Sequence, residues 1–196
     1  GTVIDYNYPK PTDNCDGMTP LKLTQCVEIP DAGVDCPSTE SSHVRIYDLA
    51  VEGVSNDYQI QNIDMGVNTS TGAPNVVVNL YVGSQISNPI TTYAGLSSIT
   101  PYATTTVNVP AGDNFMMSIP LNVFVPANNV IYIEAISPAS ADFLIGYNEF
   151  GASTAPGYIS CGGAYATPAD YSLDGSVILS IDGSEYNSLT TVQTQG

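Results

Sequence analysis

The stretch that decides the fold is Phe115-Met116-Met117-Ser118-Ile119-Pro120-Leu121-Asn122-Val123-Phe124-Val125. Apolar side chains recur at every second position from Phe115 to Val125, which is the period of a β-strand with one buried face. Pro120 falls on the opposite face. Because proline cannot donate a hydrogen bond to a β-ladder, it predicts a sheet edge, a bulge or a break at this point.

The same alternation continues outward from this stretch. Val76, Val78, Leu80 and Val82 share one face of a second predicted strand. Further strands are predicted at 44–54, 58–67, 104–109, 130–136, 142–148 and 176–182. Clusters of Gly, Pro, Asn and Asp separate these strands and predict turns. The sequence therefore predicts an all-β fold, a single jelly-roll-like β-sandwich.

The two ends of the chain lack this pattern. Residues 1–40 are predicted to form an irregular, disulfide-pinned segment packed on the sandwich, which spans 41–186. Residues 187–196 are polar and form a predicted C-terminal tail. Within the first segment, Thr2–Tyr8 is an exception, because it reads as a strand with no hairpin partner nearby.

The chain has four cysteines, Cys15, Cys26, Cys36 and Cys161. An even number in a chain so poor in lysine favours two disulfides and an oxidising compartment. Three pairings are possible and the sequence does not choose between them; we favour Cys15–Cys26 with Cys36–Cys161. A zinc site is disfavoured, because the cysteine spacings do not fit one and His43 is the only histidine.

The charge is strongly negative. Three basic residues stand against 19 carboxylates, which gives a net charge of −16. Binding to nucleic acid or to anionic lipid needs several basic side chains and is therefore not expected. No apolar run is long enough to span a membrane. The chain begins at Gly1, so we expect a mature, secreted form whose leader has been removed, located outside the cell or at its surface.

Calcium is the ligand that the acidic loops favour most. The loop Asp13-Asn14-Cys15-Asp16-Gly17 places oxygen ligands at alternating positions, as calcium loops do. Asp31 and Asp35 are predicted to approach this site once the cysteines pair. Asp170 and Asp113 are secondary candidates. The alternative is that these side chains form Asx-turns with their own backbone.

The candidates for catalysis are few. A nucleophilic triad would need His43, the one imidazole, beside a nucleophile. A lone histidine at a strand start is more often an ordinary surface or hydrogen-bonded residue. A glycosidase needs two carboxylates in a cleft. Glu134, inside the apolar run Val130–Ile136, is one candidate, although a carboxylate on the outer face of a strand has the same sequence pattern. We predict that the protein is not an enzyme.

A second group of residues suggests sugar binding. Tyr147, Tyr158, Tyr165 and Tyr171 lie in one loop-rich stretch together with Asn148. Exposed aromatic rings stack on sugar rings, and polar neighbours fix their orientation. The same tyrosines fit protein contacts or ordinary strand positions equally well.

The stretch Phe143–Gly151, followed by Ala155–Gly162, resembles a pattern of β-sandwich modules in secreted, surface-displayed proteins of Bacteroidetes-type bacteria. The match covers about half of the chain. The matching residues are Gly146, Asn148, Gly151, Pro156, Tyr158, Cys161 and Gly162. The resemblance implies a surface or adhesion module and names no ligand.

The sequence therefore predicts a calcium-stabilised, extracellular structural or adhesive surface protein. Its expected partners are copies of itself or other surface proteins. Residues 2–8 would add a strand to the open sheet edge of a neighbour, as in a filament built by strand donation. The alternative prediction is a carbohydrate-binding module that uses exposed tyrosines to bind polysaccharide.

Overall fold

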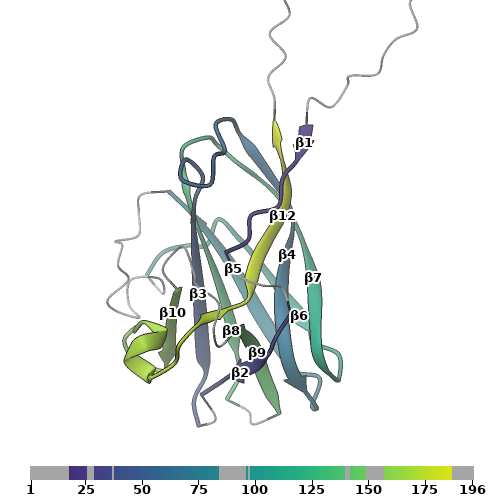
Figure 1. Cartoon of the computed structure of the whole chain (residues 1–196), viewed down its shortest axis with the longest axis vertical. Helices are drawn as coiled ribbons and strands as arrows, with labels where there is room; N and C mark the ends of the chain where they lie inside the picture. Colours follow the sequence, from purple (N-terminus) through teal and green to yellow (C-terminus); the bar gives the residue numbers. More distant parts are fainter. Residues whose placement is uncertain are drawn as a thin grey trace, which may run out of the picture.

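The computed structural model describes residues 18–25, 29–36, 38–83, 96, 98–139, 142–148 and 157–186. In this part of the chain two antiparallel sheets pack face to face as a sandwich (Figure 1). From β3 to β10 the chain passes repeatedly from one sheet to the other, as in a jelly roll. The predicted all-β, jelly-roll-like sandwich is confirmed.

The first sheet has five strands in the described residues and is regular. Its order is β10 (Gly157–Cys161), β3 (Ser41–Asp48), β8 (Val130–Ser137), β5 (Asn75–Val82) and β6 (Ala103–Asn108). All its pairings are antiparallel, and none contains a register shift. Within the described residues β6 and β10 are therefore the edges of this sheet.

The second sheet has seven strands in the same part of the chain and is branched. Its strands are β1 (Met18–Pro20), β2 (Ala32–Val34), β4 (Tyr58–Ser70), β7 (Gly112–Val125), β9 (Phe143–Asn148), β11 (Ser176–Val177) and β12 (Leu179–Tyr186). A short 3₁₀ helix, η1 (Pro168–Tyr171), precedes β11. In the described residues no helix has the length and apolar character needed to cross a bilayer.

The branch lies at β4 and depends on two glycines. β7 pairs along one side of β4, while β12 and β9 share the other side. Where they meet, Gly66 N–H donates to the Ile178 carbonyl and Ile178 N–H donates to the Gly146 carbonyl, both at 3.0 Å. A Cβ on Gly146 would lie 2.7 Å from the Gly66 carbonyl carbon. A side chain at this position would therefore separate the strands.

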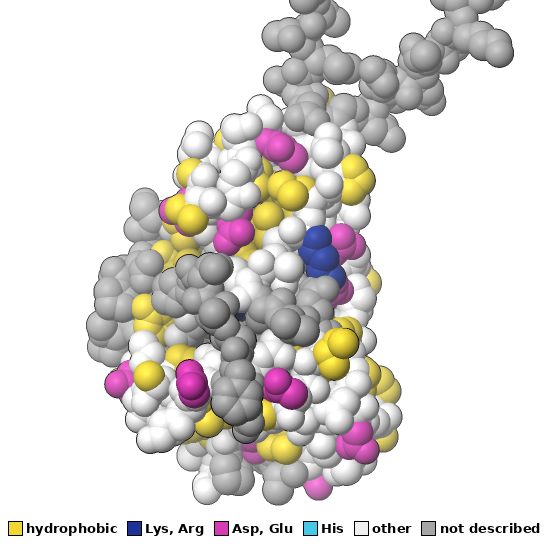
Figure 2. All heavy atoms as spheres, viewed as in Figure 1, with side chains coloured by type: hydrophobic (Ala, Val, Ile, Leu, Met, Phe, Trp, Pro, Cys, Tyr) yellow, Lys and Arg dark blue, Asp and Glu magenta, His cyan; other side chains and the backbone are white. Residues whose placement is uncertain are grey.

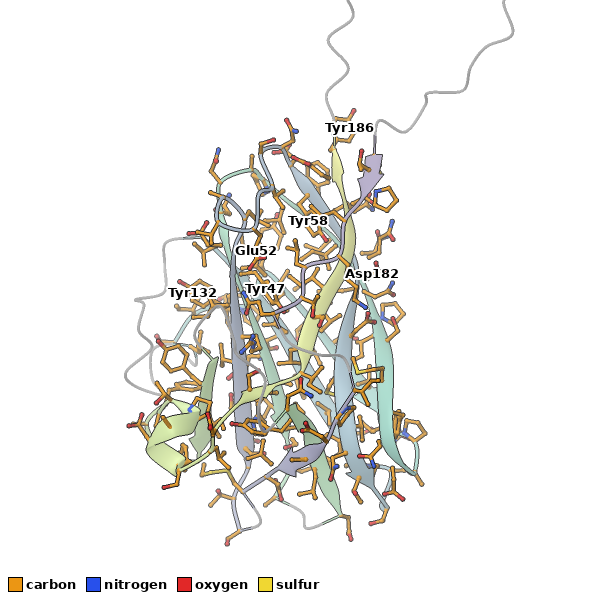
Figure 3. The ribbon with its side chains drawn as sticks, in the orientation of Figure 1. Tyr47, Glu52, Tyr58, Tyr132, Asp182 and Tyr186 are labelled. Carbon is orange, nitrogen blue, oxygen red and sulfur yellow. A yellow bond between two sulfur atoms is a disulfide. The ribbon has the colours of Figure 1, made fainter. Side chains whose placement is uncertain are left out.

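The core lies between the sheets and includes the predicted stripe of Val76, Val78 and Leu80. Two tyrosines are also buried there. The Tyr47 hydroxyl donates to the Leu179 carbonyl, and the Tyr58 hydroxyl donates to the Leu21 carbonyl. Burial, followed by the charge of Asp182 and by Tyr47, raises the pKa of Tyr58. Figure 3 shows Tyr47 and Tyr58 between the two layers.

The prediction made from Pro120 is confirmed. Among the described strands β7 pairs only with β4, so it forms an edge. The register with β4 shifts between Ile60 and Asn62, opposite Pro120–Val123. Asn122 also adopts a positive φ of 51° there. A bulge therefore interrupts this edge next to the proline.

The predicted disulfide between Cys36 and Cys161 is present, with a Cα–Cα distance of 5.4 Å. It ties the segment after β2 to the end of β10. On the chain-entropy model a bridge of this span contributes up to ~4–5 kcal/mol. Cys15 and Cys26, the predicted strand Thr2–Tyr8 and the tail 187–196 lie outside the described residues. The described part of the predicted irregular segment contains two short strands, β1 and β2.

Candidate functional site

A polar cluster lies on the outer face of the five-stranded sheet, centred on Glu134 of β8. Glu134 is 3% exposed, and its cross-strand neighbours are Val44 on β3 and Asn79 on β5. Buried tyrosines surround it on the same face, including Tyr132, which Figure 3 shows on the opposite side of β3 from Tyr47. Glu134 is thus buried outside the main core.

Four side chains hold the Glu134 carboxyl group. Its Oε1 accepts hydrogen bonds from the Ser42 hydroxyl at 2.7 Å and from the Tyr165 hydroxyl. Its Oε2 accepts from Asn79 Nδ2 at 3.1 Å and from the Tyr81 hydroxyl at 2.8 Å. A carboxylate offers about four lone-pair sites, so these contacts use its acceptor capacity in full. Each of the four partners is a neutral group.

A cavity of about 210 Å³ adjoins this cluster. Its lining residues are Asn79, Tyr81, Leu96, Ile99, Pro101, Glu134 and Ile136. One end is therefore polar, and the rest is apolar. Glu134 is the one acid among these described lining residues, whereas a glycosidase would need two. Because its lone pairs are occupied, Glu134 could act as a base or a ligand only after losing a present hydrogen bond.

The structure buries three of the four tyrosines predicted to form a sugar platform. Tyr147 is 2% exposed in the main core, and Tyr158 and Tyr165 are each 5% exposed on the outer face of the five-stranded sheet. The exposure predicted for these three is wrong. The strands that carry Tyr147 and Tyr158 are covered on both faces, and Tyr165, in the loop after β10, packs in the same cluster as Tyr158. Tyr171, at the end of η1, is 40% exposed. Asn148 is buried and donates to the Ile29 carbonyl at 2.8 Å.

The surroundings on the outer face also raise the pKa of one tyrosine, Tyr132. Burial, followed by the neighbouring Tyr158 and the charge of Asp48, raises the pKa of Tyr132. Tyr165 contributes its hydroxyl to Glu134 instead of presenting its ring to solvent. These tyrosines therefore serve the packing of the sheet and the hydrogen bonding of Glu134.

His43 lies on the inner face of β3, where its cross-strand neighbours are Ala135 and Ile159. It is fully buried, and in the described part of the chain neither ring nitrogen has a hydrogen-bond partner. Burial lowers the pKa of His43 to about 3. The side chain is therefore a neutral core residue, and not the surface or hydrogen-bonded residue that its place at a strand start predicted.

Asp31 and Asp35 are not brought together. They flank the extended strand β2, which separates their backbones by ~13 Å. Burial raises the pKa of Asp35, against the effect of hydrogen bonds from Cys36 N–H and the Ser41 hydroxyl. Asp13, Asn14 and Asp16 lie outside the described residues, so the calcium loop stays a prediction.

The rest of the acidic surface is dispersed. Figure 2 shows acidic side chains scattered over the visible face, and the described residues contain no group of three potential metal-ligating side chains. The secondary candidate Asp170 accepts from Thr167 N–H at 2.8 Å and from its hydroxyl at 2.7 Å, which lowers the pKa of Asp170. This carboxylate reaches back to Thr167 as in a capping box at the start of η1, and not in the Asx-turn of the alternative prediction.

An exposed aromatic patch that the sequence did not predict lies at one end of the sandwich. Phe124 and Tyr186 meet edge to face, with ring centroids 6.3 Å apart and planes at 71°. The Tyr102 hydroxyl donates to the Phe124 carbonyl at 3.0 Å. All three side chains are exposed, and Figure 3 shows Tyr186 at the end of the molecule. The sequence feature that could have revealed this patch is Phe124, which points away from the apolar stripe of its own strand.

The residues that carry the resemblance to surface modules have structural roles here. Gly146 allows the branch at β4, and Asn148 fixes the segment before β2. Cys161 forms the disulfide, and Gly162 adopts a positive φ of 70° directly after it. Gly151 and Pro156 lie outside the described residues. The family resemblance itself stays a prediction.

Comparison with known proteins gives little. No family model matches the chain, and no curated protein does. One solved structure, of the Gt strain of infectious bursal disease virus, matches 88% of this chain and 37% of its own with 11% sequence identity and a TM-score of 0.27. The chain thus spans little more than a third of that viral protein, and a likeness this weak carries no argument.

Proposed function

We propose that this protein is a non-catalytic, extracellular structural or adhesive protein that associates with copies of itself by exchange of a β-strand. The observation that carries the proposal is the edge of the five-stranded sheet at β6, which pairs only with β5 among the described strands. An unpaired strand edge presents free N–H and C=O groups to another chain. The Cys36–Cys161 bridge supports an oxidising compartment, where such disulfides persist.

The state of the polar residues supports a non-catalytic role. Glu134 is saturated by four hydrogen bonds, and His43 is buried without a partner among the described residues. Neither group is poised to exchange a proton with a substrate. The open strand edge favours assembly over chemistry.

The test is the mass of the assembled protein. We expect the full chain to form high-mass species in multi-angle light scattering, and we expect a chain that lacks residues 1–10 to be monomeric. A matched control removes residues 187–196 instead. If the full chain is monomeric over the micromolar range, or if the chain lacking residues 1–10 assembles equally well, the proposal is wrong.

Calcium binding by the loop at 13–17 is part of the same proposal. The charge of −16 supports it, because bound cations relieve self-repulsion in a compact state. We expect the melting temperature to rise with calcium and to fall again with a chelator. The double substitution Asp13→Asn with Asp16→Asn should abolish this response, whereas Asp170→Asn should preserve it. An equal response in both variants would place the ion elsewhere.

Carbohydrate binding is a second candidate, favoured by the exposed patch of Tyr102, Phe124 and Tyr186. Such rings offer apolar faces to a sugar. A glycan array would test it, with Tyr186→Ala as the variant that should lose binding and Tyr171→Ala as the control. Absence of binding by the wild type would remove this candidate.

A further inference from the structure

Three sheet edges differ in how they are protected. β10 is covered, because Ile159 and Ala166 exchange backbone hydrogen bonds and the disulfide ties its end. β7 carries a bulge beside Pro120. β6 has neither a proline, nor a charged residue, nor a register shift in its pairing with β5. These are the devices by which proteins block their edges. Within the described residues, β6 is the one of these three edges that lacks them.

The open side of the sandwich next to β6 is also apolar. β6 and β7 contact each other across this side. Several of their inward-facing side chains pack on the core but remain only half-buried, and we call them the β6–β7 margin: Ala103, Val107, Phe115, Met117, Leu121 and Val123. In Figure 2 hydrophobic atoms reach the surface on the side where Figure 1 draws β7. A strand laid on this margin would remove apolar area from water.

The chain contains a segment that fits this surface. In an extended Thr2–Tyr8 segment, one face carries Thr2, Ile4, Tyr6 and Tyr8 and is mostly apolar. The other carries Val3, Asp5 and Asn7 and is mostly polar. Its seven residues match the six-residue edge of β6 in length. Its apolar face matches the margin, and its polar face would continue the outer surface of the sheet. Nine residues separate it from β1, the first strand described.

We propose that the acceptor for strand exchange is the β6 edge with the β6–β7 margin, and that it binds residues 2–8 of a second copy of this chain. This inference rests on the proposed function, which requires an acceptor but does not locate it. Backbone hydrogen bonds to β6 provide affinity, and the rings of Tyr6 and Tyr8 on the margin provide specificity.

The decisive experiment places a charge at the acceptor. Val107→Lys puts an ammonium group on the inward face of β6, the kind of substitution that blocks natural edges. Val51→Lys, in an exposed turn, makes the same chemical change elsewhere and is the control. We expect Val107→Lys to be monomeric in light scattering and Val51→Lys to assemble like the wild type.

A binding measurement gives a second readout. A labelled synthetic peptide of residues 1–10 should bind the chain that lacks these residues. We expect the same truncated chain carrying Val107→Lys to bind the peptide at least tenfold more weakly, and the one carrying Val51→Lys to bind it unchanged. Hydrogen exchange tests the wild type alone: amides of 103–108 should exchange at least tenfold more slowly in the assembled full chain than in the truncated chain.

The outcomes separate the two proposals. If Val107→Lys assembles like the wild type, or if exchange across 103–108 is unchanged, the acceptor lies elsewhere and this inference is wrong, while the proposed function stands. If the full chain stays monomeric yet protects 103–108, residues 2–8 close on their own chain and the second copy is wrong. If nothing assembles and nothing is protected, both proposals fail.

Discussion

The two faces of β3 and β8 each bury an ionisable side chain, but they do so in different ways. On the inner face His43 is buried between Ala135 and Ile159 without a hydrogen-bond partner in the described residues, and it stays neutral. On the outer face Glu134 is equally buried but holds four hydrogen bonds from other strands and from Tyr165. An ionisable residue can therefore be buried either by removing its charge or by supplying it with donors. The two solutions predict different responses to mutation and to pH.

The largest effect is expected at Glu134. Its removal in Glu134→Ala leaves the buried donors Ser42, Asn79, Tyr81 and Tyr165 without their common acceptor, at a cost of ~1–3 kcal/mol for each donor that finds no substitute. With partial relaxation we expect the free energy of unfolding to fall by ~3–5 kcal/mol, measured by urea denaturation. Glu134→Gln keeps two of the four acceptor sites and should lose less. An equal loss in both variants would contradict the hydrogen-bond explanation.

The pH response comes from His43. Its folded pKa of about 3 lies below the unfolded value of 6.5, so the unfolded state binds the proton first as the pH falls. Stability is complete above pH 6.5 and is lost progressively toward pH 3. At pH 4.5 the loss amounts to about 2–3 kcal/mol. From pH 7.5 to 4.5, the unfolding free energy of the wild type should therefore fall by this amount relative to that of His43→Leu. Parallel profiles would show that His43 does not carry the effect.

A smaller loss of stability is expected at Tyr165, one of the four hydrogen-bond partners of Glu134. Tyr165→Phe removes one donor from Glu134 and keeps the ring, which we expect to lower the unfolding free energy by ~1–2 kcal/mol. Tyr171→Phe, at an exposed tyrosine, is the control and should change it by less than ~0.5 kcal/mol. Thermal and urea unfolding would both measure this. Equal values for the two variants would mean that the Tyr165 hydroxyl adds nothing to the cluster.

The smallest loss of stability is expected at Thr104, which contacts Asn79 and not Glu134 itself. The Thr104 hydroxyl on β6 donates to Asn79 Oδ1 at 2.8 Å and so fixes the amide that holds Glu134. Thr104→Val should lower the unfolding free energy by ~0.5–1 kcal/mol. Thr106→Val, two residues along the same face of β6, should be neutral or slightly stabilising. The comparison fails if Thr106→Val is the more harmful change.

Much of the fold could be predicted because strand patterns are local. The alternation from Phe115 to Val125 gave the strand and its buried face, and Pro120 alone predicted the disturbed edge. The pairing of Cys36 with Cys161 was one of three possibilities left open by the sequence. The branch at Gly66 and Gly146 had no local signal, because close approach of a third strand depends on residues distant in the chain.

The candidate site was predicted less well, for a related reason. Alternation tells which residues share a face but not whether that face is covered. Tyr158 and Tyr165 share an outer face that proves to be buried, whereas Phe124 and Tyr186 share one that is exposed. Glu134 was recognised as unusual within an apolar run. Its four partners come from two other strands and one loop, which no short window of sequence could bring together.

The sequence by itself determined the all-β class, the acidity and the two faces of the strands that it predicted, because these follow from local periodicity and composition. The tertiary structure alone decided which outer faces are covered, which carboxyl group is saturated and which edge remains open. Those properties depend on the distances between residues far apart in the chain, which exist only after the strands have paired.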